Sequence, residues 1–281
     1  MGRGAAGRAG QQPVPAVTAG PADRAIAALR TGHQDLARRV TVMTPQDLTS
    51  RSAASEWTIA DVLSHLGSGA EIMLATLDGA LGAAAVPGPG FRESVWDRWN
   101  ALAPQEQAGA FVGSNEALVS RFEGLDPSQR EHLRVDLGFL PAPIDVLTTA
   151  SLRLNEFTLH SWDIAVASDP SATLAPEAVE FLFEPLRMLI GWIGQPGRIG
   201  GVPPVLDVRT TDPERRIGLD LGETVQIVPP PADPAPTLAI PAEAFLRLTA
   251  GRLAPEHTPP GVSLDGDGPT LDDLRTTFPG F

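Results

Sequence analysis

Three residue types are missing from this chain of 281 residues: it contains no cysteine, no lysine and no tyrosine. The absence of cysteine excludes disulfides, thiolate nucleophiles and cysteine-based zinc sites. Without lysine no side chain can form a Schiff base, and without tyrosine no phenol can act as an acid or a base. Any catalysis must therefore use histidine, carboxylates, serine or threonine, arginine, or a bound metal ion.

Positive charge and long apolar runs are also scarce. The net charge of −13 argues against a nucleic acid partner, which needs a basic surface. No apolar run approaches the roughly 18 residues that cross a membrane, and residues 1–20 lack the apolar core of a secretory signal. We therefore expect a cytoplasmic protein that acts on small molecules, with residues 1–21 as a disordered extension. A binding protein without catalytic activity fits the same composition. The arginine-, alanine-, glycine- and proline-rich usage is typical of a GC-rich genome.

Helical periodicity fills the chain up to about residue 197. Thr58 and Asp61 form a capping-box pattern that marks the start of one helix, and Pro104 interrupts a later one. The apolar spacing predicts helices over residues 21–43, 58–81, 93–122, 143–167 and 176–193. Because four of these helices are long and closely connected, we predict an antiparallel four-helix bundle.

The hydrophobic pattern changes after the segment 194–197, which resembles a linker. Alternation with period two predicts strands at 205–210 and 217–221, and further strands are expected at 225–228 and 238–240. Short helices are predicted over 242–253 and 271–277. The fold class is thus a helical bundle over residues 22–197 followed by a smaller α+β domain over residues 198–281.

A possible metal site follows from the scarce histidines, of which the chain has five. Glu156 and His160 are four residues apart on one predicted helix, so their side chains share a face. His65 lies among apolar residues of another helix and is expected to point into the bundle. Together the three form a His₂Glu set that leaves one coordination position open, as in catalytic zinc sites. The spacing also fits a surface pair and a hydrogen-bonded core histidine, and it does not decide between these alternatives.

Two segments give a family resemblance. Residues 55–66, SEWTIADVLSHL, strongly resemble a segment of the mycothiol-dependent maleylpyruvate isomerase-like proteins, which belong to the DinB-like superfamily of four-helix metalloproteins. Residues 153–163, RLNEFTLHSWD, resemble a second helix of that family, and Trp99-Asn100 is similar to a pair in its third helix. The segments 242–253 and 271–281 resemble its C-terminal, sterol-carrier-like domain.

The resemblance implies a ligand set and further site residues. It places the metal ligands on His65, Glu156 and His160, with zinc preferred among divalent ions. We further expect Asn100 and Arg153 to contact the cofactor.

Four supporting roles keep two interpretations each. Asp61 either bonds the second ring nitrogen of His65 or serves only the capping box. Asp163 either supports His160, in a catalytic role, or is solvated at a helix end. Arg252 either binds a substrate carboxylate as a catalytic residue or is solvated, and Arg153 is also placed for a structural ion pair with Glu156 or Asp163.

Mycothiol, an actinobacterial thiol, is the co-substrate that the resemblance implies. A bound cation stabilises a thiolate, and the nucleophile must come from outside because the chain has no cysteine. We interpret the activity as S-transfer or thiol exchange on a small-molecule electrophile, of the kind used in secondary metabolism. One alternative is mycothiol-dependent cis–trans isomerisation of maleylpyruvate. The other is a non-catalytic, metal-stabilised protein that binds a small molecule.

Overall fold

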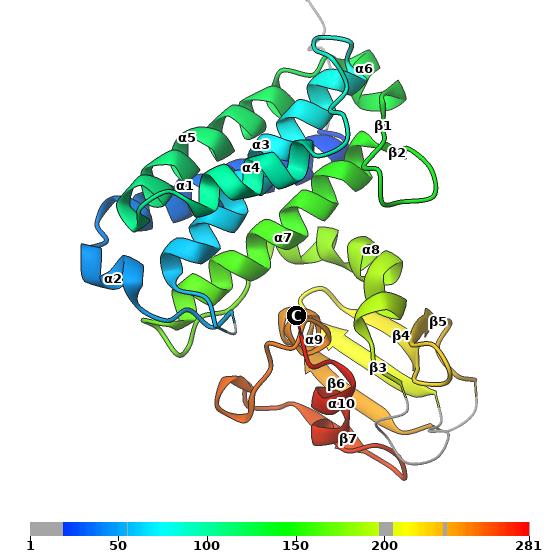
Figure 1. Ribbon diagram of the computed structural model, residues 1–281. Helices are drawn as coiled ribbons and strands as arrows, with labels where there is room; N and C mark the ends of the chain where they lie inside the picture. The colour runs from blue at the N-terminus through cyan, green and yellow to red at the C-terminus, as the bar shows by residue number, and fades with distance from the viewer. Residues whose placement is uncertain (1–18, 55, 197–204, 233–234, 281) are drawn as a thin grey trace, which may run out of the picture.

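The computed structural model describes residues 19–54, 56–196, 205–232 and 235–280. Residues 1–18 of the expected N-terminal extension lie outside these ranges, and so does the expected domain boundary at residues 197–198. The described chain is mostly helical, with one small mixed sheet, so the expected fold class is confirmed (Figure 1). No helix in the described ranges is both long and apolar enough to cross a membrane.

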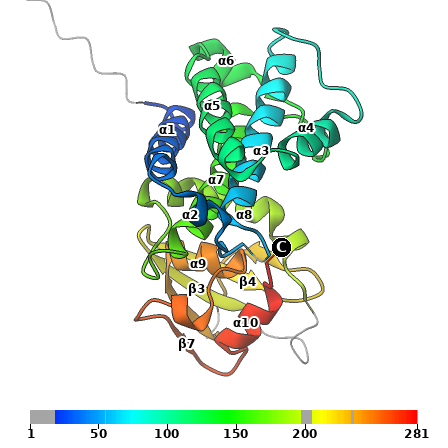
Figure 2. The ribbon, with the colours of Figure 1, turned by 60° about the vertical axis from the view of Figure 1, so that its left-hand side comes forward.

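Four long helices form the bundle. α1 (Pro21–Thr41) packs against α5 (Pro104–Glu123) and α7 (Val146–Val166), while α3 (Ile59–Ala80) packs mainly against α5 and also contacts α7. The interruption expected at Pro104 is present, because α4 (Phe91–Asn100) is a separate helix before α5. Figure 2 shows α4 on the side of α3 that faces away from α1. The bundle thus presents α3, α4 and α7 as neighbours.

Two glycines inside α3 allow close packing on two sides. A Cβ on Gly67 would lie 2.2 Å from the indole ring of Trp99, so only glycine lets α4 approach at this level. A Cβ on Gly69 would lie 3.1 Å from Nη1 of the buried Arg153. Glycine lowers helix propensity, but at these two positions a larger residue would collide with Trp99 or press against Arg153.

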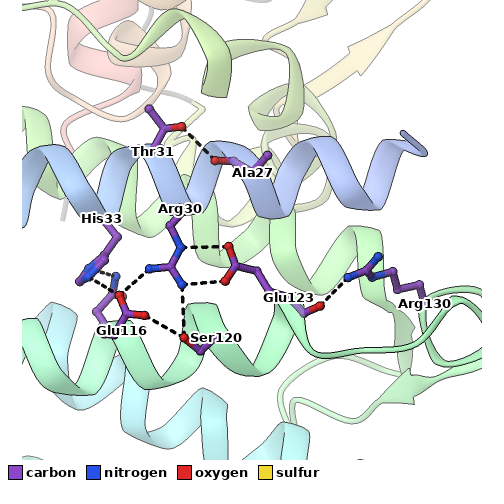
Figure 3. A network of polar contacts seen from close by, with 9 residues as sticks. Ala27, Arg30, Thr31, His33, Glu116, Ser120, Glu123 and Arg130 are labelled. Carbon is purple, nitrogen blue, oxygen red and sulfur yellow. Dashed lines mark hydrogen bonds and ion pairs between the residues drawn. The ribbon is translucent and has the colours of Figure 1, made fainter. Parts of the chain in front are cut away.

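A polar network joins α1 to α5 on the outside of the bundle (Figure 3). Arg30 donates to both oxygens of Glu123, at 2.9 and 2.7 Å, and also pairs with Glu116. His33 Nε2 lies 3.0 Å from Glu116 Oε2. Since these side chains come from two helices, the network fixes how α1 lies on α5.

The C-terminal part is a five-stranded sheet with helices packed on it. The strand order is β5-β4-β3-β6-β7, and all neighbours are antiparallel except β3 and β6. α8 (Pro176–Ile193) leads from α7 towards this sheet, and α9 packs against α8, β3 and β6 (Figure 1). The bounds are β3 (Leu206–Thr211), β4 (Arg215–Asp220), β5 (Gln226–Val228), β6 (Thr237–Pro241), α9 (Ala242–Thr249), β7 (Ser263–Asp265) and α10 (Leu271–Thr277).

Several elements differ from the sequence-based expectation. α9 ends at Thr249 and not at residue 253. Gly251 adopts a φ of +72°, a left-handed conformation that ends a right-handed helix. The expectation also missed short elements that lack enough residues to show a period. These are α2 (Pro45–Thr49), α6 (Pro127–His132), the 3₁₀ turn Pro255–His257, β7, and the two-residue strands β1 (Arg134–Val135) and β2 (Ile144–Asp145).

The turn after α9 lies directly against the segment that follows α10. A Cβ on Gly251 would lie 2.3 Å from the backbone nitrogen of Gly280, which itself has a φ of +80°. Gln195 N donates to the carbonyl of Thr277 at 2.8 Å, which ties the end of α10 to the residues after α8. These contacts fix the position of the residue that follows Gly251, Arg252.

Candidate metal centre

His65, Glu156 and His160 converge between α3 and α7. Each offers one ligand atom, and these atoms all lie within 4.8 Å of one another. Glu156 Oε2 is 3.2 Å from His65 Nε2 and 3.8 Å from His160 Nε2. The two imidazole rings meet edge to face with their centroids 4.7 Å apart. The structure thus brings together the three residues expected as ligands.

The helices explain why these three side chains meet. Glu156 and His160 lie one turn apart on α7, so they point in the same direction. α3 begins at Thr58, whose hydroxyl accepts from Asp61 N at 3.2 Å while Asp61 Oδ2 accepts from Thr58 N at 2.9 Å. This capping box fixes the helix start two turns before His65. Of the two roles considered for Asp61, the structure shows the contact with Thr58 that caps the helix.

The carboxylate of Glu156 is held in its ionised form. Its side chain remains half exposed, on the open side of the trio. Desolvation acts to raise its pKa, but a hydrogen bond with His65 and the electrostatic effects of His160, His65 and Arg153 outweigh it and lower the pKa of Glu156 to about 2. An ionised carboxylate beside two imidazoles is an apt donor set for a cation.

Asp163 connects His160 to the C-terminal part of the chain. Its side chain is fully buried, so it is not a solvated helix end. His160 Nδ1 lies 2.9 Å from Asp163 Oδ2, and Arg252 donates to both Asp163 oxygens, at 2.8 and 2.7 Å. Burial acts to raise the pKa of Asp163, but its bonds with His160 and Arg252 hold that pKa below its usual range. Asp163 therefore orients His160, as carboxylates behind metal-binding histidines do.

The guanidinium of Arg252 is bonded within the protein. Its Nε and Nη2 are both used by Asp163, and its Nη1 donates to the carbonyl of Ala250 at 2.9 Å. Binding of a substrate carboxylate by Arg252 would compete with these bonds and stays a prediction. The guanidinium instead acts on the site through Asp163.

A loop before α3 covers the two histidines. The indole of Trp57 lies 5.1 Å from the ring of His65 and 5.8 Å from that of His160, centroid to centroid. Ala53 N donates to the backbone carbonyl of Asp163 at 3.0 Å, which anchors the loop on α7. In the sequence, Trp57 appears only within the family-like segment 55–66, and its closeness to α7 could not be predicted there because it depends on this tertiary contact.

A cavity of about 480 Å³ opens beside His65. Its other lining residues are Trp57, Asp61, Ser68, Trp96 and Asn100. Asn100, expected to contact a cofactor, therefore lies next to the trio, with Ser64 Oγ 3.5 Å from its Oδ1. Trp96 was missed, although it lies four residues before Asn100 on the same face of α4.

Arg153 lies inside the bundle and not in the cavity. Its Nη2 donates to the carbonyl of Leu66 at 2.7 Å and to Asn115 Oδ1 at 2.8 Å. Burial lowers its pKa to about 10, although the negative charge of Glu156 acts to raise it. Among the described residues it forms no direct ion pair with Glu156 or Asp163, and its expected contact with a cofactor stays a prediction. Arg153 is a buried cation beneath the trio, and Asn115 links it onward to His33 Nδ1 at 3.0 Å.

Comparison with known proteins identifies the family. Residues 29–165 match the family model of the mycothiol maleylpyruvate isomerase N-terminal domain, a span that contains His65, Glu156 and His160. This span of the chain belongs to that family. A search of curated proteins gives no match.

The fold agrees with this family. A crystal structure of the mycothiol-dependent maleylpyruvate isomerase is similar, with a TM-score of 0.62, 14% identity, and coverage of 89% of this chain and 96% of that chain. A histidine-to-alanine mutant of that enzyme matches with the same values. At this identity the likeness concerns the fold, and with 89% of this chain covered it extends over both the bundle and the sheet described above.

Proposed function

We propose that this protein holds a divalent metal ion at His65, Glu156 and His160 and uses it to activate a small thiol for addition to a small electrophile. The observation that carries the proposal is the convergence of these three donors within 4.8 Å. Membership of the mycothiol maleylpyruvate isomerase family supports mycothiol as the thiol.

The donor set fits zinc in both chemistry and spacing. Tetrahedral zinc with bonds of about 2.0–2.1 Å keeps its ligand atoms about 3.4 Å apart. The two distances from Glu156 Oε2, 3.2 Å to His65 and 3.8 Å to His160, lie on either side of that value. Within the described ranges the cluster has no fourth histidine, cysteine or carboxylate, which favours an open position for an exogenous ligand over a closed structural site.

The surrounding residues prepare the site for a cation and an incoming thiol. Asp163 Oδ2 accepts a hydrogen bond from the protonated Nδ1 of His160. The lone pair of His160 Nε2 is then free to bind a metal ion together with His65 and Glu156. Glu156 is ionised and supplies one negative charge. Trp57 covers the two histidines, while the cavity lined by Asn100 gives access beside His65. A divalent ion bound there would lower the pKa of an external thiol. The resulting thiolate would be the nucleophile, since the chain has no cysteine of its own.

Isomerase-type chemistry is favoured over S-transfer, the first interpretation of the sequence. The similar crystal structures are of a mycothiol-dependent maleylpyruvate isomerase, and the matching family model carries the same name. In such a reaction the thiolate adds to a conjugated double bond, forming a C–S bond and moving an electron pair onto the carbonyl oxygen. Rotation about the resulting single bond and elimination of the thiolate then give the trans isomer. Isomerisation therefore regenerates the thiol. In S-transfer the C–S bond remains in the product, so one thiol is consumed per turnover.

The test uses the zinc-loaded full chain with mycothiol and two cis-alkenes, maleylpyruvate and the uncharged dimethyl maleate. We expect the trans product from at least one substrate, many turnovers per thiol, loss of activity on exhaustive chelation and recovery when zinc is added. Full activity after chelation would contradict the metal dependence. Loss of one thiol per product would show S-transfer instead, and no reaction of either kind would favour the non-catalytic binding protein.

A further inference from the structure

Arg153 connects the two helices that carry the proposed metal ligands. It lies on α7, three residues before Glu156, and is only 4% exposed. Its Nη2 donates at 2.7 Å to the backbone carbonyl of Leu66, the residue that follows His65 on α3. Because α3 packs mainly against α5 and less against α7, this buried bond bears directly on how far His65 lies from Glu156.

The guanidinium of Arg153 depends on two acceptors. A Cβ on Gly69 would lie 3.1 Å from its Nη1, so the glycine leaves room for the group but offers it no side chain. Its Nε is buried and has no hydrogen-bond partner in the described part of the chain. The recorded bonds both start from Nη2 and go to the carbonyl of Leu66 and, at 2.8 Å, to Asn115 Oδ1. Loss of either acceptor would leave a buried charge poorly satisfied, so each of them holds the side chain in place.

Arg153 fixes the direction of the hydrogen bonds that follow it. A guanidinium only donates, so the Asn115 atom that faces Arg153 is the amide oxygen. The amide nitrogen then lies 3.0 Å from His33 Nδ1 and donates to it. His33 therefore carries its proton on Nε2, which lies 3.0 Å from Glu116 Oε2 (Figure 3). The donors thus point from the metal centre outward to a half-exposed carboxylate on α5.

His33 must be neutral to sustain this chain of bonds. A proton on its Nδ1 would face the amide nitrogen of Asn115, and turning the amide over would set that nitrogen against Arg153. Asn115 is fully buried and His33 is 3% exposed, so water does not resolve such a conflict. Burial lowers the pKa of His33, which favours the neutral ring. The imidazole therefore acts as a fixed acceptor that orients Asn115 towards Arg153.

We propose that Arg153 is a positioning residue of the metal centre and that Asn115, oriented by neutral His33, holds it in place. The inference rests on the proposed function in one respect, namely that the trio binds a divalent ion. Arg153 sets the spacing of the ligands, because it ties the backbone beside His65 to the helical turn before Glu156. Partners outside the ligand set can orient the ligands in this way without touching the metal.

Arg153→Lys tests the positioning role, because lysine keeps the charge but is shorter and lacks the planar group. The zinc dissociation constant of the full chain, measured by competition with a fluorescent chelator, is expected to rise about tenfold. The control is Arg130→Lys, which changes a guanidinium that links α6 to Asp23 of α1 and to the carbonyl of Glu123. Its zinc affinity should equal that of the wild type, even if its free energy of unfolding is lower. Unchanged zinc affinity in folded Arg153→Lys would overturn the proposal.

Two substitutions at Asn115 separate the bond to Arg153 from general destabilisation. Asn115→Leu keeps the size but removes the acceptor, so the folded protein should bind zinc more weakly. Asn115→Asp keeps the acceptor and adds negative charge, so zinc should bind at least as tightly as in the wild type. Nitrogen-15 NMR of the metal-free protein should show the His33 proton on Nε2 in the wild type and a proton on Nδ1 in Asn115→Asp. Equal zinc affinity in the two variants, or a wild-type proton on Nδ1, would contradict the proposal.

The outcome is separable from that of the proposed function, since these assays need neither thiol nor turnover. If Arg153→Lys weakens zinc binding but no thiol reaction is found, the positioning role stands and the catalytic proposal fails. If the wild type isomerises its substrate with zinc while Arg153→Lys binds zinc as tightly, the catalytic proposal stands and the positioning role fails. A wild type that binds no zinc would overturn both.

Discussion

Asp163 and Arg252 form a two-armed ion pair that joins the helical bundle to the C-terminal part of the chain. Arg252 Nε lies 2.8 Å from Oδ1 and Nη2 lies 2.7 Å from Oδ2, across 89 residues of sequence. The same Oδ2 lies 2.9 Å from His160 Nδ1, and the backbone carbonyl of Asp163 accepts from Ala53 in the loop that carries Trp57. One buried residue therefore connects a proposed ligand, its covering loop and the second part of the chain.

Replacing Arg252 by lysine is expected to weaken zinc binding. Lysine keeps the charge but loses the planar two-armed contact, so Asp163 no longer holds His160 in one orientation. Loss of such an outer partner costs about 10–100-fold in metal affinity. The dissociation constant is measured by competition with a fluorescent chelator.

The control for this change is Arg187→Lys, since Arg187 is half exposed on α8 and pairs only loosely with Glu184 at 3.8 Å. Equal zinc affinity in the Arg252 and Arg187 variants, with both proteins folded, would show that the ion pair does not act on the metal centre.

A β-carbon at Gly251 should destabilise the fold. The residue has a φ of +72°, and a Cβ would lie 2.3 Å from Gly280 N, so Gly251→Ala adds backbone strain of about 1–2 kcal/mol before any clash is relieved. Urea denaturation gives the free energy of unfolding.

Gly113→Ala is the matched control, because Gly113 lies inside α5 and a Cβ there meets nothing within 4 Å. It should stabilise the protein by about 0.5–1 kcal/mol. If both substitutions stabilise the protein, the contact between the Gly251 turn and Gly280 does not restrict the chain.

The stability of the protein should decrease as the pH falls below about 6.5. Burial lowers the pKa of His33, and Arg30 acts in the same direction while Glu116 opposes it. The folded state thus binds fewer protons than the unfolded state. The contribution of His33 to the free energy of unfolding is therefore fully present above its pKa in the unfolded chain, about 6.5, and is lost as the pH falls through its lower pKa in the folded protein. A second loss follows between about 4.5 and 2, because Glu116 has a pKa of about 2 in the folded protein.

The measurement is the free energy of unfolding between pH 4 and 8 for the wild type and for His33→Gln, both freed of metal. The glutamine variant should lose less stability between pH 7 and 5 than the wild type. Parallel curves for the two proteins would contradict a role for His33 in this pH dependence.

Local patterns were enough to predict the helices, and together with the family resemblance they predicted the trio. The Thr58–Asp61 capping box placed the start of α3, and the four-residue spacing of Glu156 and His160 placed both on one face of α7. The position of His65 opposite them depended on the bundle that the helix lengths predict, and the family resemblance supplied the assignment of all three residues as ligands.

Long-range contacts were beyond the reach of such patterns. The pairing of Arg252 with Asp163 joins two parts of the fold that no periodicity relates, so Arg252 was expected to bind substrate. The position of Arg153 three residues before Glu156 predicts an ion pair with Glu156 or Asp163, but its long side chain turns into the space that Gly69 leaves open. The cavity formed with Trp96 depends on the close approach of α4 to α3 at Gly67.

The most direct test of the central claim is the metal content of the protein. Elemental analysis of the zinc-loaded, desalted full chain is predicted to give one zinc per chain, and Glu156→Gln and His160→Ala are predicted to lose it. His132→Ala, which removes an exposed histidine of α6, is predicted to keep one zinc. Full zinc content in His160→Ala, or none in the wild type, would contradict a metal centre at His65, Glu156 and His160.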